Sequence, residues 1–144
     1  KLPKGLKKLF CYINDLKDLP ELPKGLKELH CYSNNLTELP RLPKNLEYLD
    51  CSNNNLEELP KLPKGLKILY CNNNNLEELP EIPERLKSFL CYNNNLTDLP
   101  KLPKGLKEFW CWNNNLPYTD LESYWKWFYK ENPDLGEANK MGLF

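Results

Sequence analysis

A motif that recurs every 20 residues constrains this chain more than any other feature. Leu-Pro-Lys-Gly-Leu stands at residues 2–6, 22–26, 62–66 and 102–106, and looser copies begin at Leu42 and Ile82. Six copies follow one another without an insertion through Asp120, each close to L-P-x-x-L-x-x-L-x-C-x-x-N-x-L-x-x-L-P-x. A unit this short cannot bury its leucines by itself, so the copies must stack into a solenoid.

Each copy contains one candidate strand. From Lys8 to Tyr12 apolar and variable residues alternate, which is the period of a half-buried strand, so Leu9 and Cys11 should point inward. Two prolines per copy exclude a helix from the return path, which we expect to be extended or polyproline-like. The predicted fold is a mainly β repeat solenoid with a parallel sheet on its concave face. At about 4.8 Å per strand, six coils measure about 29 Å.

Six asparagines share one register, where each strand must bend into the return path. An amide there can satisfy backbone groups of its own coil and of the next one, so we interpret this column as structural. Its members are Asn14, Asn34, Asn54, Asn74, Asn94 and Asn114.

The repeats end at residue 120, and residues 121–144 form the second predicted unit, a helical cap and tail. Thr119 and Glu122 have the spacing of a capping box. Pro133 should end the helix. Such a helix is expected to cover the last coil, and the alternative is a protein-docking helix that uses Trp127 and Tyr129. Apolar residues recur in it at helical spacing: Leu121, Tyr124, Trp125 and Phe128.

The pattern L-x-x-L-x-C-x-x-N-x-L resembles the leucine-rich repeat signature from Leu2 to Asn115. The 20-residue unit is similar to that of effector proteins from enteric bacterial pathogens, also abundant in giant viruses of amoebae. This resemblance implies a curved solenoid that mostly binds protein. Some such effectors carry a ubiquitin-ligase domain after the repeats, for which residues 121–144 are too few. They also carry a helical cap before the repeats, whereas repeat sequence starts here at Lys1, so we expect a removed cap or an exposed first coil.

Chemistry-bearing residues do not assemble into a recognisable catalytic or metal site. The six cysteines occupy the inward strand position, where Cys packs as a small hydrophobe, and no C-x-x-C pair supplies zinc spacing. His30, Asp50 and Ser52 have the wrong order for a triad, because the imidazole would flank the carboxylate instead of standing between it and the hydroxyl. We therefore expect no enzyme activity, no catalytic residues, no cofactor and no metal.

The outward strand positions form the candidate binding surface. Eight of them are aromatic, and Tyr and Trp are enriched in interface hot spots. The alternative is that these rings stack across strands and stiffen the sheet. The candidate partner-binding residues are Phe10, Tyr12, His30, Tyr32, Tyr48, Asp50, Tyr70, Asn72, Leu90, Tyr92, Trp110 and Trp112.

Basic and acidic residues occupy different parts of each copy, although the chain's 20 Lys and Arg balance its 20 Asp and Glu. Zero net charge argues against a nucleic-acid partner, and the apolar runs are too short to span a bilayer. Acidic residues follow the strands, and a basic ridge precedes them: Lys4, Lys7, Lys24, Lys27, Lys44, Lys64, Lys67, Arg85, Lys87, Lys104 and Lys107.

Three functional hypotheses follow. The favoured one is a non-enzymatic module that binds a protein partner with its concave aromatic face. The second is a structural or engineered scaffold that self-associates through the exposed N-terminal coil, whose unpaired edge can template another chain. The third is a module that binds an anionic polymer through the basic ridge, with an affinity that falls steeply as the salt concentration rises. Six free thiols are typical of a reducing compartment, so we expect a cytoplasmic location, or the host cytosol for an effector.

Overall fold

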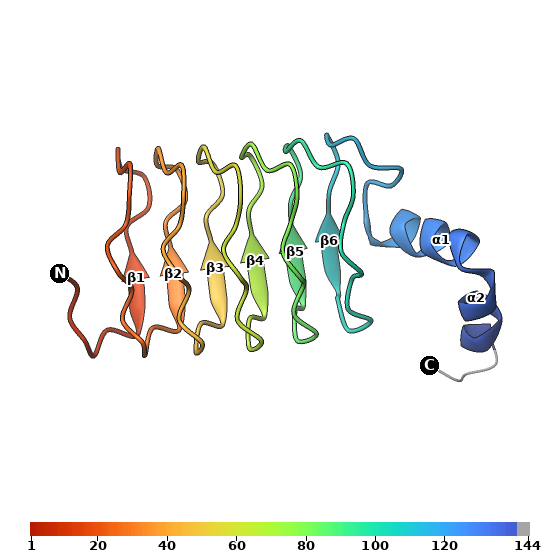
Figure 1. The fold of residues 1–144 in the computed structure, drawn as a ribbon, viewed down its shortest axis with the longest axis horizontal. Helices are drawn as coiled ribbons and strands as arrows, with labels where there is room; N and C mark the ends of the chain where they lie inside the picture. The colour runs from red at the N-terminus through yellow and green to blue at the C-terminus, as the bar shows by residue number, and fades with distance from the viewer. Residues whose placement is uncertain (141–144) are drawn as a thin grey trace.

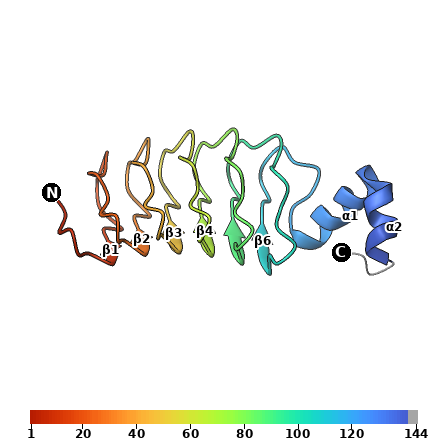
Figure 2. The same cartoon turned by 60° about the horizontal axis from the view of Figure 1, so that its bottom comes forward.

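The computed structural model describes residues 1–140 and shows a solenoid of six stacked coils, numbered here from coil 1 (residues 1–20) to coil 6 (residues 101–120). Neighbouring strands pair in parallel and in chain order, exactly one repeat apart, so the predicted solenoid is confirmed (Figures 1 and 2). The strands are β1 (Lys8–Phe10), β2 (Glu28–His30), β3 (Tyr48–Asp50), β4 (Ile68–Tyr70), β5 (Ser88–Leu90) and β6 (Glu108–Trp110).

The strands are shorter than the alternation predicted, because each ends one residue before its cysteine. Hydrogen bonds to the next coil continue beyond the strand, however: Cys11 N–H donates to His30 O at 2.9 Å, and Ile13 N–H donates to Tyr32 O at 3.0 Å. The return paths of the described coils contain turns and bends without a helix or strand. Two prolines in each copy account for this, since each proline removes a donor and fixes its own dihedral.

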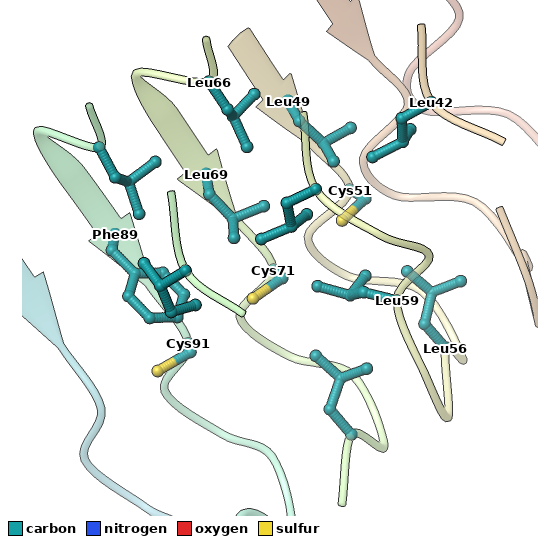
Figure 3. Close-up of a cluster of buried hydrophobic side chains, with 14 of the residues drawn as sticks. Leu42, Leu49, Cys51, Leu56, Leu59, Leu66, Leu69, Cys71, Phe89 and Cys91 are labelled. Atoms are coloured by element: carbon teal, nitrogen blue, oxygen red, sulfur yellow. The ribbon is translucent and has the colours of Figure 1, made fainter. Parts of the chain in front are cut away.

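The interior consists of leucine and cysteine columns that run along the stack (Figure 3). Leu49, Leu69, Cys51 and Cys71 have no exposed surface. A leucine buried to this degree contributes about 1.5–3 kcal/mol relative to an exposed one. Because these side chains are covered by the coils before and after them, the stability of each coil depends on its neighbours.

The asparagine column links each coil to the preceding one through hydrogen bonds. Asn54 Nδ2 donates to Cys51 O of its own coil and to Cys31 O of the preceding coil, both at 3.1 Å. Asn54 Oδ1 accepts the Leu36 N–H at 3.0 Å. The predicted structural role is thus confirmed, with one correction: the amide reaches the preceding coil, not the next one.

The residue before each of these asparagines adopts a left-handed backbone, which the sequence analysis did not anticipate. The φ angles lie between 52° and 55° at Ile13, Ser33, Asn53, Asn73, Asn93 and Asn113. Asn tolerates this region, whereas a β-branched residue there is strained. Ile13 is therefore the one position of this column where the side chain conflicts with the backbone.

Helix α1 (Leu121–Glu131) lies at the C-terminal end of the stack, beside β6 (Figure 1). Tyr124 is 2% exposed, and its ring meets that of Phe109 edge-on with centroids 6.1 Å apart. The Tyr124 hydroxyl accepts a hydrogen bond from the Leu102 N–H at 3.1 Å. Trp125, Trp127 and Phe128 also pack against the core. This helix therefore covers the apolar edge of coil 6, as the capping interpretation predicted.

Two details of the cap differ from the sequence prediction. The N-cap is Asp120 and its capping-box partner is Ser123, one residue later than the predicted Thr119 and Glu122. Asp120 Oδ1 accepts the Ser123 N–H at 2.8 Å, and a carboxylate caps a helix at least as well as a threonine. Pro133 follows the end of α1 as predicted, but it also begins a second helix, α2 (Pro133–Lys140). The part of the predicted tail at 141–144 lies outside the described residues.

Neither described helix has the length and apolar character needed to cross a bilayer.

Candidate protein-binding surface

The outer sheet face comprises the outward side chains of the six strands and of the residue two positions beyond each strand. The structure places all twelve predicted binding residues on it, but it does not expose them equally. Four are largely exposed: Phe10 (56%), Tyr12 (40%), Trp110 (46%) and Trp112 (43%). Asn72 is 5% exposed and therefore buried, contrary to its predicted place on an accessible surface. The exposed aromatic area thus lies at the two ends of the stack.

Ring stacking explains why the middle of the face is covered. His30 lies between Phe10 and Tyr48, with ring centroids 4.5 and 4.3 Å away. Tyr12 and Tyr32 stack at 4.6 Å. Because parallel coils repeat in register, each internal ring is covered by neighbours on both sides, whereas an end ring keeps one face open. The cross-strand stacking considered as an alternative is therefore present, and it leaves the end rings accessible.

Polar side chains of coils 3 to 6 on this face bond to one another. Ser52 Oγ donates to Asp50 Oδ1 at 2.6 Å. Ser88 Oγ lies 2.5 Å from Glu108 Oε2 and 3.4 Å from the Tyr70 hydroxyl. Burial, and to a smaller extent the negative charge of Asp50, raise the pKa of Tyr48 to about 12. The middle of the face is thus partly covered and hydrogen-bonded within itself.

His30 has no catalytic geometry. Its backbone pairs with Asp50, as the sequence predicted, but its Nε2 faces Glu28 Oε2 at 3.5 Å and makes no hydrogen bond. A hydrogen bond from Lys8 holds the pKa of Glu28 below its usual value. Since Ser52 bonds directly to Asp50, the imidazole does not stand between hydroxyl and carboxylate.

Coil 6 presents its two tryptophans from a fixed backbone. In coils 1–5 the cysteine N–H donates to the carbonyl of the next strand, and in coil 6 the Cys111 N–H donates to Thr119 O at 3.0 Å instead. Trp110 forms an antiparallel bridge with Asp120, the N-cap of α1. Trp112 stacks on Tyr92 at 4.4 Å with an interplanar angle of 7°. The segment before α1 therefore pairs with coil 6 where a seventh strand would, and this pairing fixes the backbone that carries the two tryptophans.

The predicted segregation of charge forms two hollows along the stack. Carboxylates gather in one of ≈ 1150 Å³, lined in part by Glu38, Glu57, Glu58, Glu77, Glu78 and Asp98. Basic residues gather in another of ≈ 810 Å³, lined in part by Lys24, Arg41, Lys44, Lys61 and Lys64. Binding of an anionic polymer to the basic surface stays a prediction.

The cysteines pack in the core. Five of the six are buried, Cys11 is half-buried, and burial raises the pKa of the Cys51 thiol well above its ordinary value. A thiol in this state is a poor nucleophile and a poor metal ligand, because both roles need the thiolate. No group of three or more metal-binding side chains occurs within residues 1–136, whose side chains the structure describes.

Comparisons with known proteins agree with this geometry. The family model described as leucine-rich repeats (two copies) matches residues 44–84. YopM from Yersinia enterocolitica WA-314 is 39% identical over 82% of this chain and 26% of its own, with a TM-score of 0.78. The leucine-rich repeat domain of a Shigella effector is 36% identical over 78% of this chain and 51% of its own, with a TM-score of 0.76. YopM from Yersinia pestis, a leucine-rich effector, is 38% identical over 81% and 40% of the two chains, with a TM-score of 0.67.

The repeat, the parallel stack and these matches together define the class: the chain is a leucine-rich repeat protein. Its 20-residue coils are of the bacterial effector type. The chain spans 26% to 51% of the length of the solved proteins it resembles. No curated protein sequence matches it.

The sequence missed one part of this surface. Ile13 is 68% exposed and extends the apolar area formed by Phe10 and Tyr12. It was overlooked because the alternating pattern ends at Tyr12, and the left-handed turn that follows directs the next side chain to solvent. The departure from the Asn or Ser of the other copies was the available signal.

Proposed function

We propose that this chain is a non-enzymatic protein-binding module that holds its partner on the outer sheet face. The observation that carries the proposal is the exposed aromatic area at the ends of this face, above all Trp110 and Trp112, which are 46% and 43% exposed. Exposed aromatic patches mark interaction sites, and rings held by stacking lose little conformational entropy on binding. The likeness to effector repeats supports it, and a reducing compartment, the host cytosol for an effector, would keep the thiols free.

Site-specific photo-crosslinking tests this proposal. A benzophenone amino acid replaces Trp112 or Tyr12 on the outer sheet face, and in matched control variants it replaces Glu57 or Glu77 in the acidic hollow. The proposal expects one partner, identified by mass spectrometry, to crosslink from Trp112 or Tyr12. Capture from Glu57 or Glu77 alone would place the binding surface on the return path and contradict it.

Alanine substitutions then test the binding energy. The double variant W110A/W112A should weaken binding of that partner at least about tenfold, because aromatic hot spots carry about 2 kcal/mol or more each. The matched control E57A/E77A changes two exposed side chains of the acidic hollow, which belong to the return path and not to the outer sheet face. Circular dichroism verifies that both variants fold. Equal affinity of W110A/W112A and the unmodified chain would exclude this surface.

Self-association through coil 1 is the second candidate, favoured by one observation. Leu2, Leu6 and Leu9 are half-buried, whereas the corresponding leucines of coil 2 are 0–6% exposed. Within the described residues β1 pairs on one side only. A concentration-dependent mass in light scattering that the substitution of Phe10 by Lys removes would support this candidate, and a constant monomer mass would exclude it.

A further inference from the structure

The outer sheet face is more acidic than the chain as a whole. In coils 2–6 it carries Glu28, Asp50 and Glu108 but neither Lys nor Arg, although the whole chain has 20 residues of each sign. Glu28 forms an ion pair with Lys8 at 3.0 Å. Asp50 and Glu108 have no ion-pair partner among the described residues. The net charge that remains on this surface is therefore negative.

Both carboxylates can accept further hydrogen bonds. Ser52 bonds to Asp50 Oδ1, and Ser88 bonds to Glu108 Oε2. The Ser52 backbone N–H also donates to Asp50 Oδ1, at 3.1 Å. An ionised carboxylate offers about four acceptor positions on its two oxygens, so Asp50 keeps about two of them, on Oδ2, and Glu108 keeps about three for a cationic donor. The serines also fix the orientation of the carboxylates, which reduces the entropy lost when a ligand binds.

The indoles beside Glu108 favour the same kind of ligand. Trp110 and Trp112 follow Glu108 on the same outward side, and both are more than 40% exposed. The face of an indole attracts a guanidinium or ammonium group, and Trp is the strongest of the aromatic side chains in this respect. Two open indoles next to a carboxylate therefore complement a cation with an aliphatic stem better than an anion or a neutral polar group.

We propose that the partner segment held by the outer sheet face is basic, with cationic side chains that pair with Glu108 and Asp50 and contact Trp110 and Trp112. This inference rests on the proposed function and names the chemistry of its partner. Asp50 is in register with Trp110, so Glu108 is displaced from it by three strands, about 14 Å, and by two residues along the strand, about 7 Å, which gives about 16 Å in all. An extended peptide rises about 3.3 Å per residue and its alternate side chains share a face, so two long side chains four residues apart, about 13 Å, can reach both carboxylates. A segment that crosses the strands should therefore carry two Arg or Lys residues about four positions apart.

NMR titration with a defined peptide tests the inference. The probe is an extended Gly/Ser peptide with Arg at positions i and i+4, and its controls carry Gln or Glu at both positions. The chain has four tryptophans, so an ¹⁵N-labelled sample gives at most four indole N–H signals, which Trp→Phe variants assign. The Arg peptide should shift the Trp110 and Trp112 signals, while Trp127, packed on Tyr118, stays in place.

Charge-neutral variants complete the test. D50N/E108Q keeps an acceptor for both serines and should weaken the Arg peptide about threefold to tenfold. The control E57Q/E77Q removes two charges from the acidic hollow and should leave the affinity unchanged. The inference is overturned if the Gln peptide shifts the indoles as strongly, if no indole signal moves, or if E57Q/E77Q abolishes binding while D50N/E108Q does not.

The failure of this inference differs from a failure of the proposed function. If Trp112 crosslinks a partner whose captured segment contains no Arg or Lys, the outer sheet face binds protein but the basic chemistry is wrong. If no outward position crosslinks a partner, the proposed function is wrong whatever the peptide titration shows.

Discussion

Coil 1 and coil 4 begin with the same seven residues, yet they differ in burial. Residues 1–7 and 61–67 both read Lys-Leu-Pro-Lys-Gly-Leu-Lys. Leu66 has no exposed surface, and its equivalent Leu6 is only half-buried. Because the local sequence is identical, the difference comes entirely from the neighbours: coil 4 lies between two coils, and coil 1 contacts only coil 2 among the described residues.

This comparison shows that the burial of a repeat's leucines depends on the surfaces of the neighbouring coils and not only on the repeat's own sequence. Each coil supplies the surface that buries the next one, so stability is approximately a sum of coil and nearest-neighbour terms. At the other end, α1 provides this surface for coil 6, and Leu106 is 5% exposed there. The two coils at the ends of the described stack therefore differ because one is covered by a helix. Four predictions test this reading.

Thiol reactivity should show the largest difference. Cys11 is half-buried, whereas Cys71 has no exposed surface and burial strongly raises its pKa. At pH 8 we expect iodoacetamide to alkylate Cys11 at least about 100-fold faster than Cys71, since a buried thiol reacts only when the structure opens. Peptide mass spectrometry measures both rates. Denaturation in guanidinium should abolish the difference, and equal rates in the native protein would contradict the comparison.

Core truncation should show the next largest effect. Leu66→Ala should lower the free energy of unfolding by about 3–4 kcal/mol, because it leaves a cavity in a fully buried site. Leu6→Ala, in the same local sequence, should cost about 1–1.5 kcal/mol, since part of the side chain is already in contact with water. Urea unfolding followed by circular dichroism measures both. Equal costs would mean that coil 1 is buried in solution, for instance by a second copy.

The sequence predicted the elements that depend on a repeated local pattern. These elements are the six parallel strands, the inward Leu and Cys columns and the asparagine column. A pattern repeated six times averages out local ambiguity, so these predictions were confirmed. The helix after the repeats was predicted separately, from the helical spacing of its own apolar residues, and it was confirmed as α1. The division into units at residues 1–120 and 121–144 stays a prediction.

Predictions failed where a single side chain decides between close alternatives. The capping box lies at Asp120 and Ser123, because Ser123 reaches back to Asp120 and the predicted Glu122 does not. Glu122 instead pairs with Lys126 at 2.7 Å. Exposure on the outer sheet face also escaped the sequence: an outward position says where a side chain points, whereas stacking on the neighbouring coils decides how much of it remains accessible.

The asparagine column provides the third prediction. Asn74 bonds to Cys71 O and Cys51 O and accepts the Leu56 N–H, whereas Asn14 donates only to Cys11 O and Tyr12 O of its own coil. Asn74→Ala should cost about 2–3 kcal/mol, since it leaves buried backbone groups unpaired. Asn14→Ala should cost less than about 1 kcal/mol, because water reaches the groups that it releases. Urea unfolding separates the two, and a cost for Asn14 that equals that for Asn74 would show that a further segment covers coil 1.

The left-handed position supplies the smallest and most local effect. Ile13 has φ of 52° and Asn53 has φ of 53°, so the same backbone carries an unfavourable residue in coil 1 and a favourable one in coil 3. Ile13→Asn should stabilise the chain by about 1 kcal/mol, and Asn53→Ile should destabilise it by about the same amount. Thermal unfolding measures both shifts. If Ile13→Asn lowers the stability instead, the exposed isoleucine must pack against another surface in solution. That contact would then offset the strain in the Ile13 backbone.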